Sequence, residues 1–200
     1  AAYSSCRAHF SVPISVPLFM KAIAYKFGND INTDLIISGR YKFSITDPNQ
    51  LAKHIFEDID PEFQKKIGRD KFFVIAGANF GCGSSREQAP MALKYAGCQA
   101  VIAKSFARIF YRNAFNLGLP LIECGTGNIK QGDEIEVDIA KGILIGPQKK
   151  YLIRIKTFTR FQKGLVEAGG IVNYYKKYRE LRIESRSYPN PHCNLIAMRV

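Results

Sequence analysis

The stretch KFFVIAGANFGCGSSREQAPMALKYAG (71–97) decides the fold that this sequence predicts. Its mainly apolar first part predicts a buried strand over 71–80, and apolar spacing predicts a helix over 86–97 that stops at Gly97. A glycine-rich turn with two serines and an arginine joins them. A turn from a strand into a helix offers free main-chain N–H groups and the positive end of the helix dipole, so it is suited to binding an anion.

The residues that follow repeat this alternation. A second apolar strand is predicted at 99–106, a helix at 107–118 with Gly118 as its C-cap, and a third strand at 119–124. Near-continuous apolar strands in the order β-α-β-α-β are typical of a parallel sheet with crossover helices. The carboxyl end of such a sheet is where α/β proteins place their ligands.

The flanking segments differ in pattern. Alternation from Met20 predicts a strand, and 47–59 predicts a helix with Asp47 as N-cap and Pro48 at its first position. The segments 132–146 and 149–158 predict paired antiparallel strands around a glycine turn, and 159–178 predicts two helices split by a Gly-Gly break. We therefore expect an α/β domain over residues 20–178, with 1–19 a leader or appended segment and 179–200 a C-terminal tail.

Composition excludes several classes of protein. The five cysteines form no CxxC pair and the three histidines lack metal-ligand spacing, so neither a disulfide framework nor a metal held by this chain is expected. No apolar run reaches the ~20 residues that cross a bilayer. The net charge of +12 is spread along the chain without a nucleic-acid-binding motif. It favours a solvated basic surface or a docking face for an acidic partner over nucleic-acid binding.

Two interpretations of the turn remain open at this point. Ser84 and Ser85 are good N-cap residues, so the turn is explained equally by a capped helix start without catalytic function. Against this, Arg86 falls in the first helical turn, where the dipole disfavours a cation, and a fixed anion would rationalise it. The spacing matches neither the P-loop nor the dinucleotide-binding pattern.

Three ordered motifs resemble one family. GANFGCGSSREQAPMAL (77–93), FGNDINTDLIISGRY (27–41) and AVIAKSFARIFYRNAFNLGLPLIEC (100–124) are similar to the signatures of the 3-isopropylmalate dehydratase small-subunit family, the swivel domain of the aconitase superfamily; EAGGIVNYYKK (167–177) resembles its usual ending. The resemblance implies a swivelling β/β/α three-layer domain, with a central mainly parallel sheet and a smaller antiparallel sheet. It also implies a large partner subunit, in a heterodimer or heterotetramer, that carries a [4Fe–4S] cluster.

The resemblance also assigns roles to residues. Ser84 is the base that moves the proton on the carbon next to a substrate carboxylate, Arg86 binds that carboxylate, and Ser85 and the turn amides complete the anion site. Asp34 supports the arginine. The implied substrate-binding residues are Asp34, Arg40, Tyr41, Lys42, Phe43 and Gly83.

The segment GRYKFSITDP (39–48) bears on the substrate. Tricarboxylate members of the superfamily carry an arginine after this tyrosine; here Lys42 follows Tyr41, and a lysine lacks the bidentate fork of an arginine. Phe43 and Ile45 suit an alkyl group, whose burial is worth roughly 1.5–3 kcal/mol. We expect a cytoplasmic hydro-lyase subunit of leucine biosynthesis that acts on isopropylmalate. The alternatives are a homoaconitate, aconitate or 2,3-dimethylmalate dehydratase, or a non-catalytic basic RNA-binding or interaction module.

Overall fold

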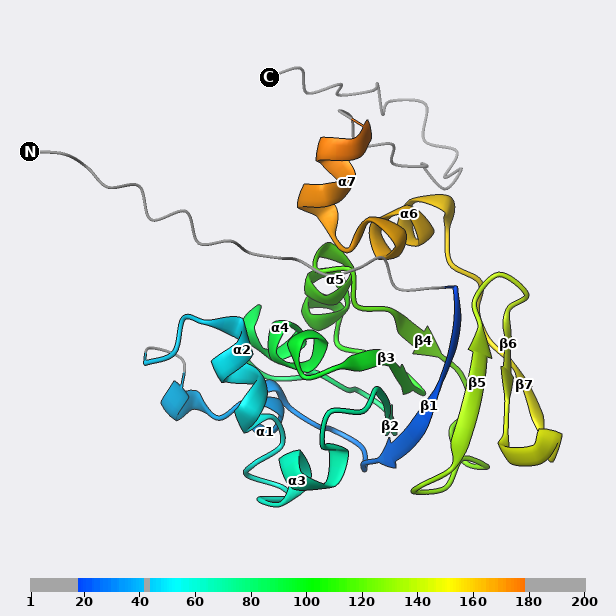
Figure 1. The fold of residues 1–200 in the computed structure, drawn as a ribbon, viewed down its shortest axis with the longest axis horizontal. Helices are drawn as coiled ribbons and strands as arrows, with labels where there is room; N and C mark the ends of the chain where they lie inside the picture. The colour runs from blue at the N-terminus through cyan, green and yellow to red at the C-terminus, as the bar shows by residue number, and fades with distance from the viewer. Residues whose placement is uncertain (1–17, 42–43, 179–200) are drawn as a thin grey trace, which may run out of the picture.

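The computed structural model describes residues 18–41 and 44–178, and in this part of the chain seven strands form one sheet in the order β4-β3-β2-β1-β5-β6-β7 (Figure 1). The strands are β1 (Phe19–Lys26), β2 (Phe72–Ala76), β3 (Cys98–Ala103), β4 (Leu121–Glu123), β5 (Glu134–Asp138), β6 (Ile143–Ile145) and β7 (Leu152–Arg154).

The sheet has a parallel half and an antiparallel half that meet at β1. Strands β1 to β4 pair in parallel, whereas β1 pairs with β5, β5 with β6 and β6 with β7 in antiparallel orientation. The predicted α/β class is confirmed. The antiparallel strands do not form a separate sheet, because the free edge of β1 pairs with β5 from Phe19 opposite Asp138 to Ile23 opposite Glu134.

The helices are α1 (Thr33–Ile36), α2 (Pro48–Leu51), α3 (Phe63–Ile67), α4 (Gln88–Tyr95), α5 (Arg108–Asn116), α6 (Arg160–Ala168) and α7 (Ile171–Tyr178). Short 3-10 turns are η1 (Gly39–Tyr41), η2 (Ala52–His54) and η3 (Pro147–Lys149). In Figure 1 helices α6 and α7 lie beside α5 at one end of the molecule, and α3 lies at the other. The predicted break between the last two helices is confirmed at Gly169 and Gly170, both with positive φ. None of the helices in the described ranges has the length and apolar character needed to span a membrane.

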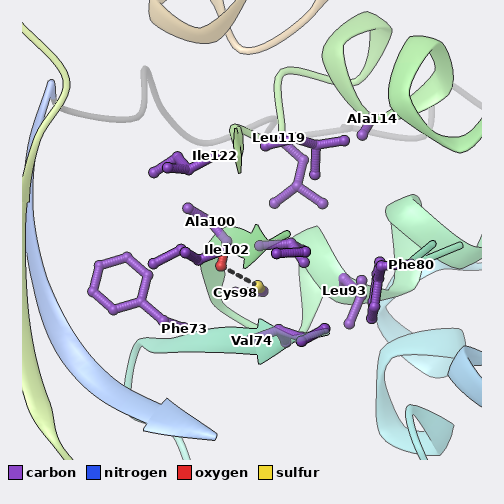
Figure 2. Packing of buried hydrophobic residues seen from close by; sticks show 14 of the residues in the cluster. Phe73, Val74, Phe80, Leu93, Cys98, Ala100, Ile102, Ala114, Leu119 and Ile122 are labelled. Atoms are coloured by element: carbon purple, nitrogen blue, oxygen red, sulfur yellow. Dashed lines mark hydrogen bonds between the residues drawn. The ribbon is translucent and has the colours of Figure 1, made fainter. Parts of the chain in front are cut away.

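The core lies around the parallel half of the sheet. Every residue of β2 is buried, as is expected of a parallel strand covered on both faces. Figure 2 shows how the core packs: Phe73 of β2 lies on the same side as Ile102 of β3, while Leu93 of α4 and Phe80 pack side by side. On β5, by contrast, buried and less buried residues alternate, as expected of a sheet with one covered face.

The predicted helix over 47–59 is wrong in length. Asp47 caps the helix as expected, but α2 ends at Leu51 and the chain leaves the helical conformation after η2. Phe56 takes a positive φ of 57° and is fully buried, stacked 4.1 Å from the ring of Phe27. Tertiary packing of this aromatic ring therefore overrides the local helical pattern.

The expected domain limits are only partly within the described residues. Strand β1 begins at Phe19, one residue before Met20. Residues 1–17 of the predicted leader and the whole tail over 179–200 lie outside the described ranges, whereas Leu18 packs against the core.

Candidate active site

Three loops run side by side at the carboxyl ends of β1, β2 and β3. The loop after β1 pairs with the turn after β2 through hydrogen bonds from the N–H of Gly81 to the carbonyl of Ile31 (2.7 Å) and from the N–H of Thr33 to the carbonyl of Cys82 (2.9 Å). The turn also pairs with the loop after β3, where the N–H of Phe80 donates to the carbonyl of Ser105 (3.1 Å). The strands thus bring three separate parts of the chain to one edge of the sheet.

The glycines of the turn are required by its geometry. Gly81 and Gly83 have φ values of +78° and +88°, which side chains other than glycine rarely adopt. A Cβ on Gly81 would lie only 2.2 Å from Cγ of Phe110, so the turn and the start of α5 touch at this point.

A cavity of about 200 Å³ opens between these loops. It is lined by Thr33 of α1, by residues 81 and 83–86 of the turn, and by residues 107–110 at the start of α5. The predicted catalytic residues Ser84, Ser85 and Arg86 therefore share one cavity, together with Gly83 of the predicted substrate-binding set.

The helix-capping interpretation of the two serines is wrong. Helix α4 begins at Gln88, and its N-cap position is Glu87, which makes no side-chain capping bond. Within residues 18–41 and 44–178, the hydroxyls of Ser84 and Ser85 make no hydrogen bond to another protein group. Both residues are exposed and line the cavity, so their hydroxyls are available to a ligand.

Arg86 is a largely buried cation with unused donors. Its side chain is 12% exposed, and Nη1 lies 2.6 Å from Oδ1 of Asp34. The geometry of this ion pair does not make a hydrogen bond, and Nε and Nη1 are buried without a hydrogen-bond partner in the described chain. A buried donor left unpaired costs about 1–3 kcal/mol, and more when it is charged. Because Arg86 lines the cavity, its positive charge would attract a carboxylate bound there.

Asp34 occupies the position predicted for it, next to the arginine. It follows Thr33 in the single turn of α1, whose N-cap Asn32 accepts a hydrogen bond from the N–H of Leu35. Gly39 packs closely on the pair, since a Cβ there would lie 3.3 Å from Oδ1 of Asp34 and 3.5 Å from Nη1 of Arg86.

Arg40 and Tyr41 do not line the cavity and contact other residues instead. Nη2 of Arg40 is 2.7 Å from Oδ1 of Asp58, and neither residue lines the cavity. The hydroxyl of Tyr41 donates to Glu57 (2.8 Å) and its ring stacks on His54 at 4.0 Å.

Glu57, which accepts the hydrogen bond from Tyr41, has a pKa that is shifted by its neighbours. The hydrogen bonds from Tyr41 and His54 lower the pKa of Glu57 below its usual value. Lys42 and Phe43 lie outside the described residues, so their predicted contacts with substrate stay predictions.

Part of the cavity wall is formed by residues that the sequence did not mark as candidates. Thr33, Arg108 and Ile109 line it, although none was a candidate residue. The last two stand inside the third motif, which marked the region but not which side chains meet the turn. Among the described residues no group of three or more His, Cys, Asp and Glu side chains is placed to hold a metal ion.

Comparison with known proteins agrees with this geometry. Residues 27–124, which include every residue lining the cavity, match the family described as the aconitase C-terminal domain. Over 160 residues the chain is 51% identical to 3-isopropylmalate dehydratase small subunit 2 of Archaeoglobus fulgidus, covering 80% of this chain and 96% of the relative. The chain belongs to the 3-isopropylmalate dehydratase small-subunit family.

Other members of this family are similarly close. The small subunit of Caldicellulosiruptor bescii is 48% identical over 161 residues, covering 80% of this chain and 96% of its own. A methanogen homoaconitase small subunit from Methanocaldococcus jannaschii is 49% identical over 160 residues, covering 80% and 93%. The crystal structure of 3-isopropylmalate dehydratase from the same organism superposes with a TM-score of 0.76 at 48% identity, covering 80% of this chain and 95% of that one.

Proposed function

We propose that this chain is the small subunit of 3-isopropylmalate dehydratase, a cytoplasmic hydro-lyase of leucine biosynthesis that interconverts 2- and 3-isopropylmalate together with a large subunit. The observation that carries the proposal is the pairing, in one cavity, of the unsatisfied guanidinium of Arg86 with the free hydroxyls of Ser84 and Ser85. This set of groups fits a substrate carboxylate and a proton on the neighbouring carbon.

Each side chain has a separate role in this mechanism. Arg86, which lines the cavity, binds the carboxylate next to the reacting carbon through its guanidinium group. Ser84 takes the proton from that carbon, the electrons of the broken C–H bond form a carbon–carbon double bond, and the hydroxyl on the adjacent carbon leaves as water with a proton from an acid that we assign to the large subunit. In the rehydration that completes the isomerisation, Ser84 delivers its proton to the carbon that lost the hydroxyl, and water adds its hydroxyl to the carbon that lost the proton and gives its remaining proton back to that acid.

A serine hydroxyl is a weak base unless its anionic form is stabilised. The positive charge of Arg86, the main-chain N–H groups of the turn and the hydroxyl of Ser85 would provide that stabilisation, in the manner of an oxyanion hole. Asp34 holds the guanidinium in place through the ion pair with Nη1. The [4Fe–4S] cluster that we assign to the large subunit would supply a Lewis acid for the departing hydroxyl.

Homoaconitate is a second candidate substrate, because the chain is 49% identical to a methanogen homoaconitase small subunit. Tricarboxylate substrates need a cation for their third carboxylate. Arg40 is the described arginine of the 39–48 segment, and it is already engaged with Asp58 at 2.7 Å. Arg108 at the start of α5 also lines the cavity, however, and is a cation within reach of a third carboxylate. The choice between the two substrates therefore rests on the kinetic comparison below.

The test is to co-express the chain with the large subunit from the same organism and purify the complex without oxygen. We expect the highest kcat/KM with isopropylmalate among isopropylmalate, 2,3-dimethylmalate, homoaconitate and aconitate. A preference for homoaconitate would select the second candidate, and no turnover of any of the four would overturn the dehydratase assignment in favour of an interaction module. Stoichiometric iron and sulfide in the isolated small chain would contradict the placing of the cluster on the partner.

A further inference from the structure

Thr33 makes two contacts that join the loop after β1 to the catalytic turn. It is 2% exposed and lines the cavity. Its N–H donates to the carbonyl of Cys82, and its hydroxyl Oγ1 donates to the carbonyl of Ser84 at 2.9 Å. One residue of α1 is therefore bound to the turn on both sides of Gly83.

Ser84 has little else to hold it. It is exposed and follows Gly83, whose positive φ of +88° and missing side chain leave the local backbone with wide conformational freedom. Among the described residues, the hydrogen bond from Thr33 is the one that Ser84 makes to another part of the protein. That bond fixes the peptide group of Ser84, and so the point from which its side chain projects into the cavity.

The residue that provides the bond is itself firmly placed. Helix α1 is capped by Asn32 at one end and anchored by the fully buried Ile36 at the other. The next residue after Thr33 is Asp34, which holds the guanidinium of Arg86. Two consecutive residues of one helical turn thus hold the proton acceptor and the carboxylate-binding group.

We propose that Thr33 is a positioning residue, which sets the orientation of Ser84 relative to Arg86 through its hydroxyl group. The inference rests on the proposed function, because it assigns Ser84 as the base. A side chain that aligns the base acts on the chemical step and leaves the binding of the carboxylate by Arg86 nearly intact.

The experiment compares two threonines in the reconstituted complex. Thr33→Val keeps the size and branching of the side chain and removes the hydroxyl, and Thr33→Ser keeps the hydroxyl. Thr126→Val is the matched control: Thr126 is 3% exposed and donates from Oγ1 to the carbonyl of Ala76 at 3.0 Å, outside the cavity.

With isopropylmalate as substrate, kcat of Thr33→Val should fall by about 10-fold or more, since misplacement of a reacting group by about 1 Å can cost 10²-fold. Its KM should change by less than about twofold, because the carboxylate is still held in the ground state. Thr33→Ser should restore most of the turnover. Thr126→Val should lower the melting temperature to a similar extent and keep the wild-type kcat.

Equal kcat values for Thr33→Val and Thr126→Val would overturn the positioning role, as would a failure of Thr33→Ser to restore turnover. Ser84→Ala separates this result from a failure of the proposed function. If Ser84→Ala is inactive while Thr33→Val is fully active, only the role of Thr33 is lost. If Ser84→Ala is itself fully active, the base lies elsewhere and the proposed mechanism is lost with it.

Discussion

Arg86 of the turn at 81–86 and Arg40 of the segment at 39–58 each form an ion pair with an aspartate. The two ion pairs differ in their surroundings. Arg86 is 12% exposed and lies 2.6 Å from Asp34, with two buried donors unsatisfied. Arg40 is 59% exposed, lies 2.7 Å from Asp58, and uses the same contact as a hydrogen bond. In the first pair the arginine lines the cavity, whereas neither residue of the second pair does.

The difference shows what distinguishes an arginine that binds a ligand from one that only anchors the chain. An exposed ion pair contributes about 0–1 kcal/mol and its donors are served by water. A buried guanidinium with unused donors carries a penalty that a ligand can remove, so it marks a place where an anion binds. The 39–58 segment is best described as a support, in which Arg40 and Tyr41 fix the chain directly before the predicted substrate contacts Lys42 and Phe43.

The largest effect is expected from Ser84→Ala. This change removes the proposed proton acceptor and leaves Arg86 and the turn amides in place, so kcat should fall by at least about 10²-fold, the low end of a general-base contribution. Substrate affinity should change little. Ser85→Ala is the neighbouring control and should have a much milder effect. Steady-state kinetics of the reconstituted complex would measure both, and a Ser84→Ala enzyme with normal turnover would remove the basis for assigning the base.

Arg86→Lys tests the carboxylate-binding role. A lysine is a point charge without the guanidinium fork. Losing one charge-assisted hydrogen bond costs about 1.5–3 kcal/mol, so kcat/KM should fall by about 10- to 100-fold. KM should rise and kcat should fall, because the carboxylate is bound in both the ground and the transition state.

Arg40→Lys is the matched change in the other region. Because the Arg40–Asp58 pair is exposed, kcat/KM should change by about twofold or less. Equal losses in the two lysine variants would contradict the distinction between the binding pair and the anchoring pair.

Gly39→Ala probes the packing against the buried pair. The added Cβ would lie 3.3 Å from Oδ1 of Asp34, so the ion pair has to shift by a few tenths of an ångström. We expect KM to rise by a few-fold, roughly what about 1 kcal/mol of lost binding produces. Gly28→Ala is the control, since a Cβ at Gly28 meets nothing within 4 Å. A Gly39→Ala enzyme with the KM of Gly28→Ala would mean that the pair tolerates displacement.

The smallest effect is expected from Glu57→Gln, in the anchoring segment. The pKa of Glu57 is lowered from its usual 4.5, first by the hydrogen bond from Tyr41 and then by that from His54. A carboxyl whose pKa is lower in the folded state stabilises the protein above pH 4.5, and this contribution is lost as the pH falls through the folded-state pKa. The melting temperature of wild type should therefore exceed that of Glu57→Gln at pH 7, and the difference should shrink towards pH 3. A pH-independent difference would contradict a charge-dependent contact.

Much of the fold was predictable because its signals are local. Apolar runs predicted β2 and β3, and the glycines at 97, 118 and 169–170 marked helix ends because positive φ values favour glycine. The helix over 47–59 was mispredicted, since the burial of Phe56 against Phe27 involves residues far apart in the sequence. The joining of the two halves of the sheet through β1 was not predictable for the same reason.

The site, like the fold, has features that the sequence predicts and features that it does not. The sequence by itself determined that Ser84, Ser85 and Arg86 stand together on a turn at the end of a parallel strand, since their spacing and the glycines are local properties. The family resemblance placed Asp34 next to Arg86, as the structure has it. Only the tertiary structure decided that Thr33 binds this turn, that residues 107–110 complete the cavity wall, and that Arg40 pairs elsewhere. The physical reason is that burial and hydrogen-bond satisfaction depend on groups brought together from distant parts of the chain, and a linear pattern of residue types does not contain them.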